Sequence, residues 1–373
     1  KISVDPAHHA VGTNNGVGAT ITPSTDGMGV FIYRSGDGSG NIDWDDITLR
    51  WMYRQSPNAV HDTMNVTLQV FAIEMVYIPE SSFYLGDGNM AFAPSSNAFR
   101  INSKAPTIPK GNEAYLVQSE NAITFVSSSS TSLTDAYDPT SYTSVSYTLP
   151  ADFTKGYAAF YCMKYEVSQK QYVDFFNTLN GSTTTQKSNR NLSNTGLYRN
   201  DFRWTGSAGA DAFLMTGTSG DRAQNYLGWH DACAYSDWAG LRPMSEMEYE
   251  KASRGYAQGI GPIYPVRYEY AWGNTSIKNP YATLLNDGAS NESLNDTSNC
   301  NYGSSSYAQG PLRNGIFAAK NPSYQKRRAT GASFYGVMEL SGNLSEMVVS
   351  TFLPYNRYCP VPVLAFSRNI NGD

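Results

Sequence analysis

The chain has 373 residues and a net charge of −5, and hydrophobic residues make up 40% of it. This length suits two domains, and the hydrophobic content supports a sizeable core, which excludes a disordered protein. Acidic and basic residues are mixed along the chain, so the basic stripe of a nucleic-acid-binding protein is missing, and no apolar run is long enough to span a membrane. Charged residues are only 16% of the chain whereas tyrosine occurs 27 times, a composition typical of extracellular and binding proteins because tyrosine combines contact area with a polar tip.

The first 72 residues show the pattern of a small β domain. Apolar and polar residues alternate in Gly29–Tyr33, Ile47–Trp51 and Val66–Val70, as they do in half-buried strands. Clusters of turn-forming residues separate these runs. The pattern predicts a small antiparallel β-sandwich over residues 1–72, preceding a second domain.

The second domain is expected to cover residues 73–373 and to begin with two strands, at Met75–Pro79 and Phe83–Asp87. Residues 88–150 are rich in Ser, Thr, Asn and Pro and are expected to form a long surface insertion. A further strand at Phe160–Val167 leads into a helix.

Three helices can be placed by their starts and stops. Ser168 and Gln171 form a capping-box pair at the start of the first helix. A second helix follows Trp229 and is expected to stop at Gly240. Ser245 starts the third with Glu248 three residues on, again a capping box, so Ser245 is interpreted as a cap and not as a nucleophile. Beyond this helix loops dominate.

Five blocks in this second domain resemble, in order, the formylglycine-generating, sulfatase-modifying-factor family. They are Met75–Pro79 with Phe83–Gly86, Tyr165–Ser168 with Tyr172 and Phe175, Trp229–Glu250, Tyr270–Asn274 and Tyr335–Met347. The resemblance covers about residues 73–350. It implies an α+β, C-type-lectin-like fold that is rich in loops.

The resemblance also implies a chemistry for which this sequence lacks the residues. The family's oxidases bind copper through a cysteine pair that follows an Arg-Gly-Gly strand, and no such strand precedes Asp373. The four cysteines (Cys162, Cys233, Cys300 and Cys359) are far apart in sequence, whereas copper(I) needs soft thiolates close together. Copper is therefore not expected. The four histidines (His8, His9, His61 and His230) also lack the spacing of the iron-dependent sulfoxide synthases, a related branch.

One metal site of the family carries over in part. The family binds structural calcium around its last motif, and the matching positions here are Glu339, Gly342, Leu344 and Glu346. Carboxylates and main-chain carbonyls are ligands that suit a hard cation. Glu339 stands where the family usually has Asn or Asp, and Ser345 replaces a Trp. The alternative is a capped turn with Glu346 in solvent.

Two functions remain open. The first is a non-catalytic extracellular or cell-surface module for ligand binding, adhesion or self-assembly into a structural polymer, with a surface ligand or neighbouring subunits as partners. The second is a copper-dependent formylglycine-generating oxidase, or a related enzyme, whose catalytic cysteines lie beyond the chain end. The first is favoured, because the copper-binding cysteine pair is missing, the loops are rich in Tyr and Asn, and fold resemblance alone is only a prior on function.

The C-terminal core is expected to be incomplete. If the family's last strands are missing, apolar residues such as Val76, Ile78, Phe83 and Leu85 would face water, and each would forgo about 1.5–3 kcal/mol of burial. A gap-filling segment is therefore expected, either from the same polypeptide or from a neighbouring subunit that adds strands and so builds a homopolymer.

Overall fold

The chain divides into two compact units, Lys1–Ala72 and Ile73–Asp373. The computed structural model describes residues 2–4, 18–25, 27, 29–36, 44, 47–54, 60–86, 100–101, 114–126, 133–134, 146–179, 198–204, 213–215, 220–256, 269–277, 284–295, 298–302, 310–320, 327–349 and 351.

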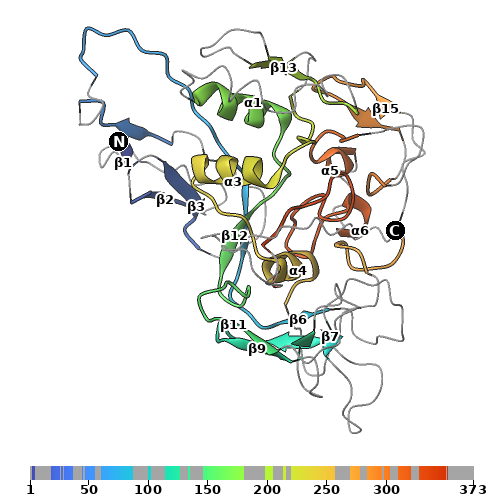
Figure 1. Ribbon diagram of the computed structural model, residues 1–373. Helices are drawn as coiled ribbons and strands as arrows, with labels where there is room; N and C mark the ends of the chain where they lie inside the picture. The colour runs from blue at the N-terminus through green and yellow to red at the C-terminus, as the bar shows by residue number, and fades with distance from the viewer. Residues whose placement is uncertain are drawn as a thin grey trace, which may run out of the picture. The chain divides into compact units, whose positions relative to one another are not determined.

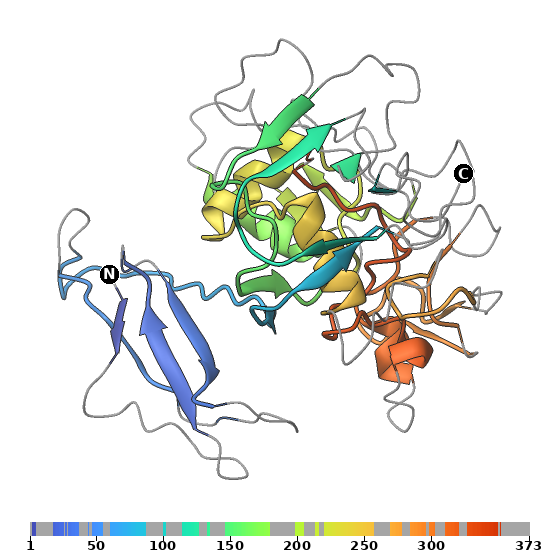
Figure 2. The same cartoon turned by 90° about the horizontal axis from the view of Figure 1, so that it is seen from below.

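The first unit holds two antiparallel strand pairs, drawn in dark blue in Figure 2. β1 (Ile2–Val4) pairs with β4 (Leu49–Trp51), and β2 (Ala19–Pro23) pairs with β3 (Val30–Arg34). Two of the three predicted strands are thus present. The strand predicted at Val66–Val70 is wrong: this segment forms no ladder with any described strand, and its apolar side chains are exposed. Two strand pairs do not by themselves make a sandwich, which stays a prediction.

The second unit combines helices with small antiparallel sheets (Figure 1). Three strand pairs lie near its start: β5 (Met75–Ile78) with β12 (Phe160–Met163), β6 (Phe83–Leu85) with β8 (Tyr115–Val117), and β9 (Ile123–Val126) with β11 (Ser146–Leu149). Three shorter pairs are β7 (Arg100–Ile101) with β10 (Leu133–Thr134), β13 (Phe202–Trp204) with β14 (Phe213–Met215), and β15 (Leu284–Leu285) with β16 (Ser293–Leu294).

Three apolar residues of the opening strands, Ile78, Phe83 and Leu85, are buried, whereas Val76 is half-buried. Phe83 and Leu85 are 0% exposed and pack with Val117, Ile123 and Leu149. The last three residues lie inside the segment expected to be a surface insertion, so that segment supplies part of the core. The expectation that the opening strands would face water without a gap-filling segment is therefore wrong for Phe83 and Leu85. It is also wrong for Ile78, which is 0% exposed in a separate cluster.

Helix α1 (Gln169–Thr178) lies beside α3 (Trp229–Trp238) (Figure 1). The two helices pack through aromatic side chains. The Tyr172 and Phe176 rings meet edge to face at 4.5 Å, and Phe175 meets Tyr235 in the same way at 5.7 Å. The predicted capping box of α1 is confirmed, because Gln171 N donates to Ser168 Oγ and Ser168 N donates to Gln171 Oε1. This pair fixes the direction in which the preceding segment, with Glu166, enters the core.

Helix α4 (Glu246–Arg254) is buried on nearly every side. Its predicted capping box is also confirmed, since Ser245 Oγ accepts from Glu248 N at 3.0 Å and Glu248 Oε2 accepts from Ser245 N at 2.8 Å. Glu246 N donates to Val349 O at 2.9 Å, which anchors the chain just after the last sequence motif. Two short helices, α5 (Ile316–Lys320) and α6 (Arg327–Thr330), complete the described elements.

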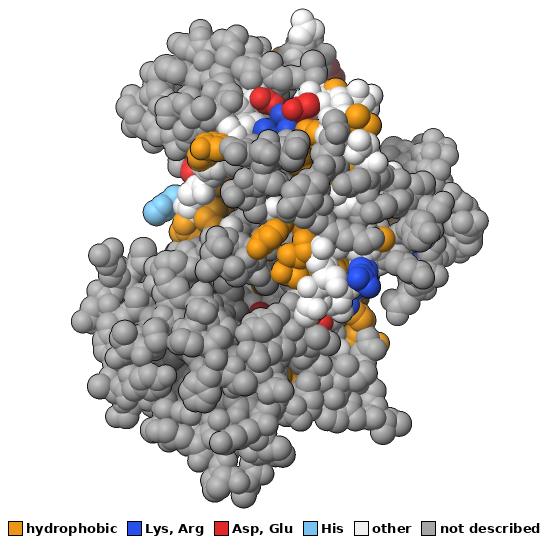
Figure 3. Space-filling model, turned by 90° about the vertical axis from the view of Figure 1, so that its right-hand side faces the viewer, with side chains coloured by type: hydrophobic (Ala, Val, Ile, Leu, Met, Phe, Trp, Pro, Cys, Tyr) orange, Lys and Arg blue, Asp and Glu red, His pale blue; other side chains and the backbone are white. Residues whose placement is uncertain are grey.

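Charged side chains of both signs lie on the face shown in Figure 3, where acidic and basic groups are direct neighbours near the top of the view. None of the helices in the described part of the chain has the length and apolar character that a membrane crossing requires.

Candidate functional site

The last motif folds into a tight turn that depends on three left-handed residues. Glu339, Gly342 and Asn343 have φ angles of 59°, 105° and 61°. A Cβ at position 342 would lie 2.7 Å from the main-chain oxygen of Asn301, so glycine is required there by space as well as by φ. Asn343 N donates to that same oxygen at 2.9 Å, and Asn343 Oδ1 accepts from Leu312 N at 2.8 Å. The turn is therefore fixed by contacts with Asn301 and Leu312, which lie 42 and 31 residues earlier in the chain.

Glu166 reaches this turn from the segment that leads into α1. Its Oε1 accepts from Leu344 N at 3.1 Å, and its Oε2 accepts from the Asn343 side-chain amide. Its main-chain oxygen accepts from Asn314 Nδ2 at 2.7 Å. Both carboxylate oxygens of Glu166 are thus used to hold the turn.

Glu339 and Glu346 bring two more carboxyl groups to the same place. Glu339 Oε1 accepts from Gly315 N at 2.7 Å, but Glu339 Oε2 and Glu346 Oε1 are buried without a hydrogen-bond partner. Burial raises the pKa of Glu339 to about 7, and burial together with the charge of Glu339 raises the pKa of Glu346 to about 8. Burial and the charges of Glu346 and Glu339 also raise the pKa of Glu166 well above its ordinary value.

Three neighbouring buried carboxyl groups need either protons or a cation. The two unpartnered carboxylate oxygens fit a hard cation, which would replace the missing donors and balance the negative charge. Among the described residues, no three His, Cys, Asp or Glu side chains are grouped as metal ligands would be. An ion here would therefore depend on main-chain or amide oxygens in addition to Glu339 and Glu346.

The four residues predicted to hold calcium lie within one turn of chain. Gly342 and Glu339 are buried, and Leu344 and Glu346 are half-buried. The alternative expected Glu346 in solvent. Its Oε1 atom is buried, while the residue as a whole is half-buried. Calcium itself stays a prediction.

The described thiols are not arranged for metal chemistry. Cys162, Cys233 and Cys300 are free, without a disulfide. Burial raises the pKa of Cys162 and of Cys300 to about 12, and it also raises the pKa of Cys233. These groups are held as neutral thiols, the opposite of the thiolates that bind copper(I). Cys359 lies outside the described residues.

Residues 127–367 match the family described as sulfatase-modifying factor enzyme 1-like domain, a match that covers well over half of the chain. The chain belongs to this family. The predicted resemblance is thereby confirmed. No curated protein matches the chain. The C-type-lectin-like fold stays a prediction.

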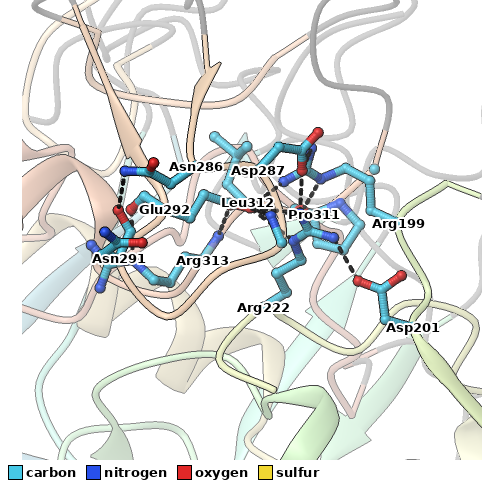
Figure 4. A network of polar contacts seen from close by, with 12 residues as sticks. Arg199, Asp201, Arg222, Asn286, Asp287, Asn291, Glu292, Pro311, Leu312 and Arg313 are labelled. Carbon is cyan, nitrogen blue, oxygen red and sulfur yellow. Dashed lines mark hydrogen bonds and ion pairs between the residues drawn. The ribbon is translucent and has the colours of Figure 1, made fainter. Parts of the chain in front are cut away.

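A second polar cluster in the family domain was not foreseen from the sequence (Figure 4). Glu292 is 0% exposed, and its Oε2 accepts from Arg199 Nη2 at 2.7 Å and from Arg222 Nη2 at 2.6 Å. Its Oε1 accepts from Arg313 N at 3.0 Å. Asp201 and Asp287 add further ion pairs to the same arginines. Every oxygen of Glu292 is satisfied, so this cluster holds loops together and leaves no acceptor for a ligand.

Sequence reasoning also assigned no role to Glu166 or Asn314. Glu166 belongs to one of the five quoted blocks, yet a single acid between an aromatic and an apolar residue gives no sign of its partner. Asn314 stands in an ordinary turn sequence. Only the tertiary structure brings these two residues to the turn of the last motif.

Proposed function

We propose that this member of the family is a non-catalytic extracellular or cell-surface module that binds a ligand or a partner protein. The observation that carries the proposal is the state of the described thiols, which are unpaired and whose pKa values are raised by burial. A copper oxidase needs neighbouring thiolates, because copper(I) is a soft ion. Buried thiols that stay neutral do not supply that ligand pair.

The fold that would support this function is a C-type-lectin-like scaffold with variable loops. Such scaffolds change function by changing loops, without new chemistry. The surface of the family domain offers aromatic contact groups: Tyr77 and Tyr161 are paired across β5 and β12, their rings are 5.2 Å apart, and they are 50% and 47% exposed. Exposed tyrosines of this kind favour binding.

Calcium is the cofactor in this proposal, with Glu339, Glu346 and the main-chain oxygens of Gly342 and Leu344 as ligands. The support is the pair of buried, unpartnered carboxylate oxygens. The ion would stabilise the last-motif turn and take no part in a reaction.

Self-assembly into a homopolymer has less support than binding of a surface ligand. It depended on open, apolar strands that a neighbouring subunit would cover, but Ile78, Phe83 and Leu85 are buried within the unit. Binding of a surface ligand does not depend on that argument and is therefore preferred.

The test is an oxidation assay. The chain is loaded with copper(I) and incubated with a cysteine-containing sulfatase peptide and oxygen, beside an active formylglycine-forming member of the family. We expect no aldehyde product from this chain. Copper-dependent aldehyde product from this chain would overturn the proposal. A Cys162→Ser, Cys300→Ser double variant would then show whether these two described thiols form the product or a thiolate site elsewhere in the chain does.

A further inference from the structure

Three buried side-chain oxygens at the last-motif turn have no hydrogen-bond partner. They are Glu339 Oε2, Glu346 Oε1 and Asn314 Oδ1. Glu339, which is only 5% exposed, contacts the chain next to Asn314, because its other oxygen accepts from Gly315 N at 2.7 Å. The three oxygens come from two separate segments of chain. A buried acceptor normally finds a donor, so an unpartnered set of three points to a missing positive group.

The orientation of the Asn314 amide is fixed by its own hydrogen bond. Nδ2 donates to the main-chain oxygen of Glu166 at 2.7 Å. A reversed amide would place Oδ1 against that carbonyl oxygen, and two acceptors would then face each other. Oδ1 therefore points away from Glu166 O and stays without a donor. A neutral amide oxygen in this setting is a good ligand for a hard cation.

Glu166 contributes in a different way. Both of its carboxylate oxygens accept from the turn, one from Leu344 N and one from the Asn343 side chain. Its main-chain oxygen orients Asn314. Glu166 thus touches the turn and Asn314 together, with no carboxylate oxygen left over for an ion.

We infer that Asn314 is a further ligand of the cation site, through Oδ1, and that Glu166 is a positioning residue that fixes both Asn314 and the Asn343–Leu344 turn. This inference rests on the proposed calcium site. It extends the site beyond the last motif to Asn314 and Glu166, which lie about 30 and 180 positions earlier in the chain. Tertiary contacts bring these residues to the turn.

Terbium(III) is the probe, since it replaces calcium and its luminescence lifetimes in water and deuterium oxide count the waters bound to it. Asn314→Ala should raise that count by about one, because water takes the place of the lost oxygen, and should weaken calcium binding by roughly tenfold or more. Glu166→Gln should weaken calcium binding by about 10–100-fold while the water count stays the same, because Glu166 is not a ligand.

Asn225→Ala is the matched control. Asn225 Nδ2 also donates to a main-chain oxygen, that of Tyr198 at 2.9 Å, and its Oδ1 is also buried without a partner. This variant should leave both the affinity and the water count unchanged. Unfolding curves recorded without calcium show whether each variant is folded before its binding is measured.

The outcomes separate the two proposals. If the unchanged protein binds neither calcium nor terbium, the calcium site itself is wrong. If it binds both and Asn314→Ala, shown to be folded, keeps the wild-type affinity and water count, then only the role of Asn314 is wrong. A rise in the water count of Glu166→Gln would make Glu166 a ligand and overturn its positioning role.

Discussion

Replacing Glu292 by Gln should destabilise the family domain by about 3–5 kcal/mol, the usual cost of breaking a buried ion-pair network by removing one partner. The side chain keeps its shape but loses its charge. Glu292 Oε2 accepts from Arg199, Arg222 and Gly288, whereas Oε1 accepts from Arg313 N. Whichever position the new amide nitrogen takes, it faces an N–H donor. At least one buried donor is therefore left unsatisfied, at about 1–3 kcal/mol. The two guanidinium groups also lose their most buried counter-charge and keep only the more exposed carboxylates of Asp201 and Asp287.

The assay is thermal and denaturant unfolding of the whole chain, followed through the transition of the family domain. The loss should lower Tm by on the order of 10 °C for a domain of this size. Asp287→Asn is the matched control, because Asp287 contacts the same arginines but its side chain is 61% exposed; it should cost less than about 1 kcal/mol. The reasoning fails if Glu292→Gln unfolds within experimental error of the wild type, or if Asp287→Asn costs as much.

Two further predictions concern buried charge. Without calcium, stability should fall as pH rises from about 4.5 toward 8, because the pKa of Glu346 is raised to about 8 in the folded protein and the extra proton is lost across that window. Each pH unit should cost about 1.4 kcal/mol for one such group. Glu346→Gln should reduce the slope without removing it, because the pKa values of Glu339 and Glu166 are raised as well. Added calcium should oppose the loss of stability, and a wild-type curve without slope in the presence of a chelator would contradict the prediction. Lys251→Met should cost about 1–3 kcal/mol, because Lys251 is 0% exposed and Nζ donates to Pro79 O at 2.7 Å and Tyr157 O at 3.1 Å. Lys170→Met, at a side chain 62% exposed, is its control, and a Lys251→Met protein as stable as the wild type would contradict the prediction.

Local features of the second domain could be predicted because they depend on neighbours in sequence. The capping boxes at Ser168 and Ser245 need only a hydroxyl and an acid or amide three residues later, and both are present with both hydrogen bonds. The stop after α3 is equally local, since Gly240 has the left-handed φ of 69° that ends a helix there. The five sequence blocks quoted for the resemblance occur in the order of the family, and this order was enough to indicate it.

Features that depend on distant partners could not be predicted. The alternation in Val66–Val70 is a correct strand pattern, but a strand also needs a neighbour to pair with, and the sequence does not show whether one exists. Residues 88–150 have a polar composition, but three apolar residues among them complete the core around Phe83 and Leu85: Val117, Ile123 and Leu149. Composition alone therefore predicted a surface insertion, whereas a few apolar side chains place part of this segment in the core.

The candidate site shows the same division. Glu339 and Glu346 could be named because they stand at positions of the last motif that match the calcium ligands of the family it resembles. Glu166 and Asn314 could not, because they reach the turn from the α1 approach and from the segment before α5. No local pattern marks an acid whose hydrogen-bond partners lie almost half the chain away.

The most direct test of the account is the metal content of the native protein after dialysis against buffer that contains both calcium and copper(I). Elemental analysis of wild type and of a Glu339→Gln, Glu346→Gln double variant is compared with protein concentration. The account predicts one calcium ion per wild-type chain, its loss in the double variant, and no stoichiometric copper in either. One tightly held copper ion per chain, with calcium unchanged by the double variant, would contradict both the calcium site and the non-catalytic function.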